Sequence, residues 1–246
     1  MNKYAIILAA GKGTRMHSEL PKCAYPFCNK PMVKWIVEGC NKAGVNDIVA
    51  VVGFKKDDII KVLGNSVEYA VQTEQKGTGD AAKCTKDFFK GKKGLCLVFP
   101  GDVPLIDEDI ISRLIDTHIT NKNDLTIVST IVKDAGYYGR IARVNGNVKR
   151  IVEAKDCNEE ELKIKEINSG LYCVDIELMF DALDKINNNN NSHEYYFTDI
   201  IEIIGKNHHV DSFVVSEEES YKLIGINDLD TLANAEKLYY SHHNNE

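Results

Sequence analysis

The chain has 246 residues, of which 43% are hydrophobic, so it can bury a complete core as one large α/β domain or as two small ones. Its formal net charge of −7 excludes a broad basic face, and we therefore expect neither nucleic acid nor a membrane as a partner. An anionic substrate would have to be held by local positive charges. Composition leaves the oligomeric state open.

The seven cysteines are scattered, and none has a CxxC or Cys/His metal spacing, so we expect reduced structural thiols. The apolar run at the N-terminus is far shorter than the roughly 20 residues that span a bilayer, and Gly11-Lys12-Gly13 interrupts it. We interpret this run as a buried first strand rather than a signal peptide. Both observations favour a cytoplasmic protein.

Short strand-like runs alternate with helical spacing through the first half, which predicts βαβ units and a mostly parallel sheet covered by helices on both faces. The expected strands are Tyr4–Leu8, Ile48–Val52, Leu95–Phe99 and Leu125–Ile131, and the expected helices are Pro31–Ala43, Asp57–Leu63, Thr78–Phe89 and Asp107–His118. This half therefore belongs to the α/β class.

The second half changes character. The segment Tyr138–Glu153 alternates in polarity and turns at Asn145-Gly146-Asn147, which predicts a hairpin. We interpret this hairpin as an insertion that supplies a lid or a second wall for a binding site. After a helix-like run over Ile176–Ile186, the homopolymeric run Asn187–Asn191 predicts a solvated loop with no chemistry.

No internal repeat and no Pro-, Gly- or Ser-rich linker divides the chain. We therefore expect residues 1–240 to form a single domain with two lobes. The polar residues 241–246 are expected to form a flexible tail.

A cluster of cations follows the first strand. The turn Gly11–Arg15 presents backbone N–H groups to anionic oxygens, and Lys12, Arg15 and Lys22 place three cations within eleven residues. The pattern is neither a Walker A loop nor a complete dinucleotide-binding fingerprint. For such a loop alone, a plain strand-to-helix turn with solvated charges remains the alternative.

Two further polar segments follow predicted strands. Gln72–Asp80 comes after a strand-like run at Val67–Val71, and Gly101-Asp102 ends the apolar strand Leu95–Phe99. Both segments are therefore expected at the carboxyl edge of the sheet, where ligands bind in open α/β sheets. Taken alone, the glutamines fit surface positions, and Asp102 fits a helix cap as well as a Mg²⁺ ligand.

The run LAAGKGTRM followed by Pro21-Lys22 resembles the L-x-x-G-x-G-T-R-M…P-K signature of the sugar-nucleotide pyrophosphorylases, a family of nucleotidyltransferases. The resemblance implies a Rossmann-like nucleotide-diphospho-sugar transferase fold, in which helices flank a mostly parallel mixed sheet and a smaller β-rich lobe binds the sugar. It makes Arg15 and Lys22 the catalytic contacts to the triphosphate. The loop residues to which it assigns nucleotide binding are Leu8, Ala9, Ala10, Gly11, Gly13 and Thr14.

Gln72–Asp80 resembles the Q-x-E-Q-x-G-T-x-x-A motif with which uridylyltransferases of this family read the pyrimidine. By this resemblance the base-binding residues are Gln72, Gln75, Gly77 and Thr78. The G-D-V-P-L motif and a late G-x-N motif imply a Mg²⁺ site at Asp102 and Asn227. The chain departs from the family at Pro100, where a tyrosine is common, and this leaves the sugar contact at that position open.

Four later motifs, Y-G-R, I-V-E-x-K-D, E-I-N-x-G and E-Y-Y-x-T-D, resemble the sugar-binding segments of the N-acetylglucosamine 1-phosphate uridylyltransferases. Each motif alone is weak, because a Tyr-Gly or an Asn-Ser-Gly is usually just a turn. Eight motifs in the family's order, from residue 8 to residue 227, are a specific match. The sugar-binding residues that they imply are Gly139, Glu153, Asn168, Tyr196 and Thr198.

The chain is most similar in motif content to the N-terminal uridylyltransferase domain of bifunctional bacterial enzymes that also acetylate glucosamine 1-phosphate. The resemblance implies Mg²⁺-assisted attack of N-acetylglucosamine 1-phosphate on the α-phosphorus of UTP, which releases pyrophosphate. Those enzymes carry a C-terminal left-handed β-helix of hexapeptide repeats. The sequence contains no such repeat, so we expect neither acetyl transfer nor the trimer that the β-helix organises.

Two alternatives stay open from the sequence. The first is a pyrophosphorylase for another pair of substrates, such as glucose 1-phosphate with UTP or TTP. The second is a regulatory protein that binds a sugar nucleotide without turning it over. That second class predicts a missing cation or metal ligand, whereas Arg15, Lys22, Asp102 and Asn227 are all present.

Overall fold

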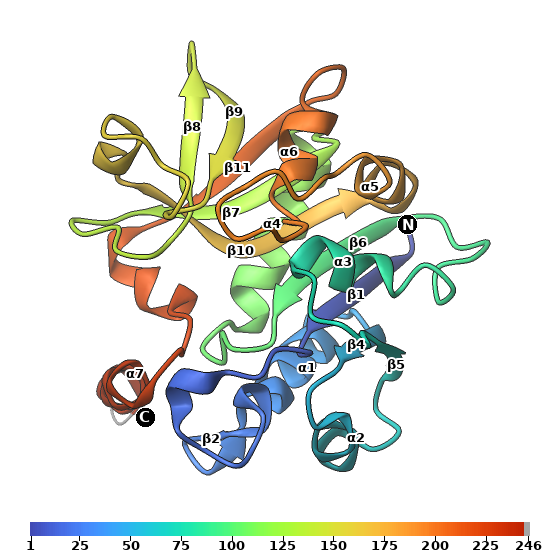
Figure 1. Ribbon diagram of the computed structural model, residues 1–246, viewed down its shortest axis with the longest axis vertical. Coiled ribbons are helices and arrows are strands. Elements are labelled where there is room, and N and C mark those ends of the chain that lie inside the picture. Colours follow the sequence, from blue (N-terminus) through green and yellow to red (C-terminus); the bar gives the residue numbers. More distant parts are fainter. Residues whose placement is uncertain (244–246) are drawn as a thin grey trace.

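A computed structural model describes residues 1–243, which form one nine-stranded sheet with helices on both faces (Figure 1). The sheet order is β11-β7-β10-β6-β1-β4-β5, and the hairpin β8–β9 joins it through β10. The strands are β1 (Lys3–Leu8), β4 (Asp47–Val52), β5 (Glu68–Val71), β6 (Leu95–Pro100), β7 (Leu125–Ile131), β8 (Arg140–Val144), β9 (Asn147–Val152), β10 (Glu166–Asp175) and β11 (Val210–Val215).

Helices and short turns connect these strands. The helices are α1 (Met32–Lys42), α2 (Lys56–Leu63), α3 (Thr78–Lys83), α4 (Glu108–Thr120), α5 (Ile176–Leu183), α6 (Asp199–Ile204) and α7 (Leu229–His243). The remaining elements are the small hairpin β2 (Pro26–Phe27) with β3 (Lys30–Pro31) and the 3-10 turns η1 (Thr14–Met16), η2 (Lys22–Ala24), η3 (Glu161–Lys163) and η4 (Glu217–Leu223). None of the helices in residues 1–243 combines the length and the apolar character that crossing a bilayer requires.

The sheet is mixed but mostly parallel, as the sequence predicted. Strands β5, β4, β1 and β6 pair in parallel, as do β7 and β11, whereas β10 runs antiparallel to both β6 and β7. The register pairs Leu8 with Val51 and Pro100, so the carboxyl ends of β1, β4 and β6 meet at one edge. The loops that follow these strands therefore converge in space.

Helices cover both faces of the sheet, which explains why the strands are apolar throughout. In β1, Ala5 and Ile7 pack in the cluster that includes α1 and α4, while Tyr4 and Ile6 pack in the cluster that includes α3 and α5. Because neighbouring side chains on a strand point to opposite faces, a strand covered on both sides has no polar face. The two clusters together form the core of the domain.

The expected strands and the hairpin lie within two residues of their observed bounds, and so do three of the four helices expected in the first half. The helix-like run Ile176–Ile186 forms α5, which ends earlier, at Leu183. The prediction of a helix over Thr78–Phe89 is wrong beyond Lys83. There the Thr85 hydroxyl donates to the Ala82 carbonyl at 2.7 Å, and the N–H groups of Thr85 and Lys86 bond to carbonyls three residues back. Such local bonding replaces the i→i−4 pattern and ends the α-helix.

The C-terminal segment also differs from its prediction. Helix α7 continues through Ser241 to His243, and the His243 ring stacks on Tyr239 with 4.2 Å between ring centroids. The expected flexible tail is therefore helical at residues 241–243, and residues 244–246 lie outside the described part of the chain. All seven cysteines are free thiols, as predicted.

Candidate functional site

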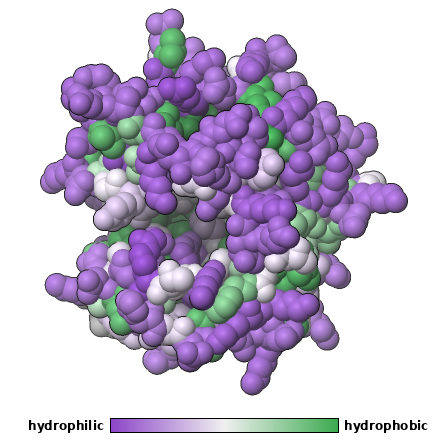
Figure 2. All heavy atoms as spheres, viewed as in Figure 1, coloured by the Kyte–Doolittle hydropathy of each residue, from purple (hydrophilic) through white to green (hydrophobic). Residues whose placement is uncertain are grey.

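A cavity of about 310 Å³ opens at the carboxyl edge of the sheet, where the sequence placed the nucleotide site. Figure 2 shows a hollow between the part of the molecule that carries β8 and β9 and the part that carries the N-terminal segment. Nine of the residues predicted to bind nucleotide, phosphate or metal line the cavity, namely Leu8, Ala10, Gly11, Lys22, Gln72, Gln75, Gly77, Thr78 and Asp102.

The loop after β1 folds closely over Lys22. Gly13 has a φ of +64°, and a side chain there would collide with the Lys22 stem, so this position requires glycine. Two backbone bonds hold the start of the loop: Ala9 N–H donates to Val51 at 2.9 Å, and Phe54 N–H donates to Ala10 at 3.1 Å. Thr14 begins the 3-10 turn η1, which carries Arg15 toward Asn227.

Four predicted side chains from distant parts of the chain meet beside the cavity. The Lys22 ammonium donates to the Asp102 carboxylate and, at 3.0 Å, to Asn227 Oδ1. Arg15 Nη2 donates to the same Asn227 oxygen at 3.1 Å. Lys12 lies elsewhere, with its ammonium 5.4 Å from the centre of the Phe54 ring. The site therefore combines two cations with two oxygen ligands.

Lys22 stays charged at this position. Burial acts to lower the pKa of its ammonium, but the adjacent Asp102 carboxylate outweighs burial, and the net pKa is raised. A partly buried ammonium of this kind attracts phosphate oxygens more strongly than a solvated one, because water screens it less.

The oxygens of Asp102 and Asn227 fit a magnesium ion that shares its coordination with a substrate. Both contact the Lys22 ammonium, so they converge on one point, and both are hard oxygen donors. Within residues 1–243 no group of three or more His, Cys, Asp or Glu side chains is arranged to hold a metal. The remaining ligands of such an ion would be phosphate oxygens and water, the usual arrangement for Mg²⁺.

The segment Gln72–Asp80, predicted from the sequence to bind the base and called the base-reading segment below, also lines the cavity. Gln72 is buried, and its Nε2 donates to Gly77 O at 3.1 Å and to Asp80 Oδ2 at 2.8 Å. Gln75 Nε2 lies 3.4 Å from Gln72 O. Gly77 has a φ of +117°, and a side chain there would collide with the Tyr195 backbone. The chain thus brings the backbone of Tyr195 directly against this segment.

Four of the five predicted sugar-binding residues form a second cluster. Asn168 N–H donates to Gly139 O at 2.9 Å, and Thr198 Oγ1 donates to Glu153 Oε1 at 3.0 Å. Gly139 also packs beside Glu153, since a Cβ on this glycine would lie 3.6 Å from Glu153 Oε2. For the fifth residue, Tyr196, burial raises the pKa of the hydroxyl; Ser192 opposes this shift, and Asp156 and Glu153 add to it.

Burial raises the pKa of the Glu153 carboxyl; the Thr198 hydroxyl opposes this shift, and Asp156 and Asp199 add to it. Asn168 Nδ2 donates to the Tyr172 hydroxyl at 2.7 Å, which fixes the orientation of the Asn168 side chain. The cluster thus holds a carboxylate with strong acceptor character beside an oriented amide, a combination suited to the hydroxyl and amide groups of a sugar.

The cavity is also lined by residues that were not among the predicted site residues. Cys23, Ala81, Pro100 and Glu194 line the cavity. Pro100 packs against Gly170 of β10, where its ring lies 3.2 Å from the position of a Cβ. Cys23 follows Lys22 directly, and this adjacency was the only signal for it in the sequence.

Tyr138 connects the two clusters. Its hydroxyl accepts a hydrogen bond from Gly225 N–H at 3.3 Å, two residues before Asn227, and Tyr138 directly precedes Gly139. On the far side of Asn227, the Thr231 hydroxyl accepts the Asn227 N–H at 3.0 Å. The Asn227 loop is therefore held from both ends, by contacts that no motif contained.

Comparison with known proteins agrees with this geometry. Residues 4–229 match the family model described as nucleotidyl transferase. The chain is 48% identical over 240 residues to the bifunctional protein GlmU of Clostridium beijerinckii and 43% identical over 241 residues to that of Clostridium perfringens. Each alignment covers 97% of this chain but 52% of the relative, so the chain spans about half the length of these curated relatives.

The fold is also found among solved structures. A UDP-glucose pyrophosphorylase complexed with UDP-glucose superposes with a TM-score of 0.76 at 19% sequence identity, covering 99% of this chain and 100% of the other. At such low identity the likeness concerns the fold. The family match over residues 4–229 shows that this chain belongs to the nucleotidyl transferase family.

Proposed function

We propose that the chain transfers a uridylyl group from UTP to N-acetylglucosamine 1-phosphate, giving UDP-N-acetylglucosamine and pyrophosphate. A phosphate oxygen of the sugar phosphate forms a bond to the α-phosphorus of UTP. The bond from that phosphorus to the bridging oxygen of the β-phosphate breaks, and pyrophosphate leaves with the electron pair. No protein nucleophile takes part, so catalysis depends on positioning and on neutralising charge.

The observation that carries the proposal is the meeting of Arg15, Lys22, Asp102 and Asn227 beside a cavity lined by the Gln72–Thr78 segment. This arrangement places two cations, which can bind a triphosphate, beside a segment that resembles the pyrimidine-binding motif of the uridylyltransferases. The cluster of Glu153 and Asn168 supports N-acetylglucosamine as the sugar. The identity to relatives named bifunctional protein GlmU supports the same branch of the family.

In this proposal Lys22 and Arg15 bind the β- and γ-phosphates. Lys22 exchanges its contacts with Asp102 and Asn227 for phosphate oxygens when the nucleotide binds, which frees both oxygen ligands. Asp102 and Asn227 would then hold Mg²⁺, which when bound draws electron density from the phosphate oxygens and brings the two polyanions together. Glu153 accepts hydrogen bonds from sugar hydroxyls and so orients the attacking phosphate.

The test measures pyrophosphate release for each pairing of UTP, TTP and CTP with N-acetylglucosamine 1-phosphate and glucose 1-phosphate, with and without Mg²⁺. We expect the highest kcat/KM with UTP and N-acetylglucosamine 1-phosphate. Higher kcat/KM with another pair would reassign the substrates. Release with no pair, together with tight binding of a sugar nucleotide, would identify a binding protein instead.

A further inference from the structure

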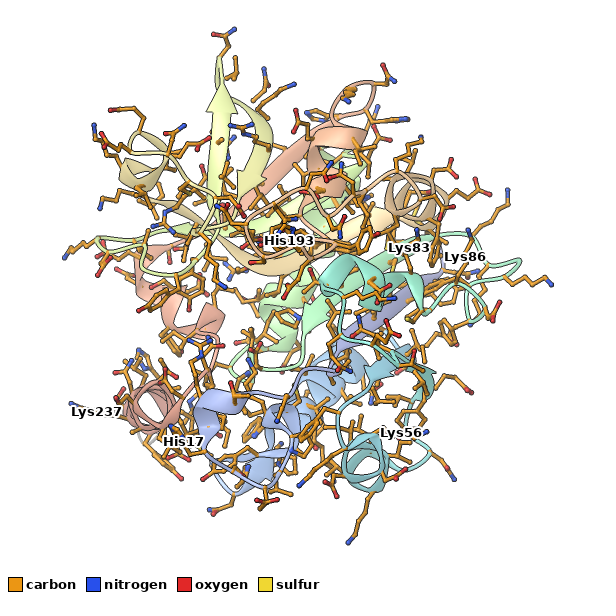
Figure 3. The ribbon with its side chains drawn as sticks, in the orientation of Figure 1. His17, Lys56, Lys83, Lys86, His193 and Lys237 are labelled. Carbon is orange, nitrogen blue, oxygen red and sulfur yellow. The ribbon has the colours of Figure 1, made fainter. Side chains whose placement is uncertain are left out.

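The loop between α5 and α6 contains the asparagine run Asn187–Asn191, and His193, labelled near the centre of Figure 3, marks its position. The prediction that this run is a solvated loop holds for the exposed Asn187 and Asn189. Asn191 is exposed as well and Asn190 is partly exposed, but the side chains of both also bond to the backbone of neighbouring segments. Those segments carry Glu153 and Thr198, two members of the cluster of predicted sugar-binding residues.

Asn191 holds the turn that begins at Glu153. Its side-chain Nδ2 donates to Lys155 O at 2.8 Å, and its backbone N–H donates to Asp156 Oδ1 at 2.9 Å. The turn itself is closed by Asp156 N–H, which donates to Glu153 O at 2.8 Å. Asn191 therefore bonds to Lys155 and Asp156, which complete the turn that begins at Glu153.

Asn190 holds the segment that leads to Thr198. Its Nδ2 donates to Glu194 O at 2.6 Å, and its Oδ1 accepts from the N–H groups of Ser192 and Glu194, each at 3.2 Å. Directly after Glu194, Tyr195 joins the base-reading segment by donating its N–H to Lys76 O at 2.8 Å. The adjacent pair Asn190-Asn191 thus connects the Glu153 turn to the Glu194–Thr198 segment.

This connection opposes electrostatic repulsion. Glu153, Asp156, Asp199 and Glu194 crowd together; Asp156 and Asp199 raise the pKa of Glu153, after burial itself. One oxygen of Asp156, Oδ2, is buried and makes no hydrogen bond within the described residues. Like charges drive the turn and the segment apart. Neutral amide donors bind them together without adding a cation that would compete for Glu153.

We propose that Asn191, supported by Asn190, is a positioning residue that keeps the Glu153 carboxylate in place for the hydroxyl groups of the sugar substrate. This inference rests on the proposed function, because it assigns Glu153 to the sugar. It predicts that disturbing Asn191 weakens sugar binding and leaves the nucleotide site, on the other side of the Glu194–Thr198 segment, unchanged.

The experiment replaces Asn191 by aspartate, which keeps the shape of the side chain but turns its donor into an acceptor facing Lys155 O and adds charge beside Asp156. The matched control is Asn189→Asp, which adds the same charge in the same loop, where the side chain of Asn189 makes no hydrogen bond within residues 1–243. Steady-state kinetics give KM and kcat, calorimetry gives the Kd of UTP, and thermal unfolding monitors the fold.

We expect Asn191→Asp to raise the KM for N-acetylglucosamine 1-phosphate about tenfold, because the lost hydrogen bond to Lys155 O and the added charge beside Asp156 both displace the Glu153 turn, with kcat and the Kd of UTP close to wild type. Asn191→Ala should raise KM less, and it carries the test if the aspartate variant unfolds. An unchanged KM in both variants, or an equal rise in Asn189→Asp, would overturn the inference. Absence of turnover in the wild type would instead overturn the proposed function.

Discussion

The nucleotide region and the sugar region of the site are built in different ways. Arg15, Lys22 and Asp102 lie on loops that leave the neighbouring parallel strands β1 and β6, and side-chain hydrogen bonds then join Arg15 and Lys22 to Asn227 and Lys22 to Asp102. Glu153 follows the hairpin strand β9, Asn168 lies on the antiparallel strand β10 and Thr198 precedes α6. Here one side-chain hydrogen bond joins Thr198 to Glu153, and the backbone N–H of Asn168 donates to Gly139 O. Parallel strand ends thus place the first region, whereas the second is assembled from elements of different kinds. Changes to the first should stop the chemistry, and changes to the second should alter substrate binding.

The largest effect should come from removing the divalent cation. Lys22 and Arg15 bring two positive charges to this part of the site, which leaves much of the negative charge on a triphosphate and a sugar phosphate uncompensated without Mg²⁺. We expect EDTA to abolish pyrophosphate release and added Mg²⁺ to restore it. Undiminished turnover in EDTA would show that Asp102 and Asn227 do not serve a metal.

Replacing Lys22 should come next. We expect Lys22→Ala to lower kcat about 10²- to 10³-fold, since it removes a partly buried cation that would face developing negative charge. The KM for the sugar phosphate should change little, because Glu153 and Asn168 remain. Lys12→Ala is the matched control, since Lys12 lies over the Phe54 ring rather than at Asp102. Equal losses in both variants would contradict the special role of Lys22.

A smaller effect is expected in the sugar region. Glu153→Gln should raise the KM for the sugar phosphate roughly 10- to 100-fold, the cost of weakening hydrogen bonds to a charged acceptor. Calorimetry with UTP should give a wild-type Kd. In the wild type, KM should rise as pH falls, beginning at higher pH than for an ordinary carboxylate, because burial raises the pKa of Glu153. The variant should lack this pH dependence, and its persistence would exclude Glu153 as the titrating group.

The smallest effect concerns stability rather than catalysis. Burial, with help from Glu202 and Asp156, raises the pKa of Asp199 to about 6, so its ionised form destabilises the fold above that pH. Asp199→Asn should therefore stabilise the protein at pH 8 by about 1 kcal/mol, a value reduced because the site is half exposed. At pH 5, where Asp199 is mostly protonated in the folded state, the gain should shrink. Thermal unfolding at both pH values measures it, and a larger gain at pH 5 would reverse the assigned sign.

The two regions also differed in how far the sequence predicted them. The phosphate loop was predictable because an apolar strand and a glycine turn are local patterns, and the order of the parallel strands then places Asp102 nearby. The contact between Tyr138 and Gly225 joins residues 87 positions apart, and no local pattern encodes it. The early end of α3 was missed because a single hydroxyl, that of Thr85, decides it.

The segment Tyr195–Thr198 separates the two regions and is bonded to both. Phe197 N–H donates to Thr78 Oγ1 at 3.0 Å on the nucleotide side, while Thr198 donates to Glu153 on the sugar side. Nucleotide and sugar phosphate would therefore contact opposite sides of one segment, and any free energy that couples their binding would pass through it. Thermodynamic linkage makes such an effect mutual. If bound nucleotide raises the affinity for the sugar phosphate by some factor, bound sugar phosphate raises the affinity for the nucleotide by the same factor.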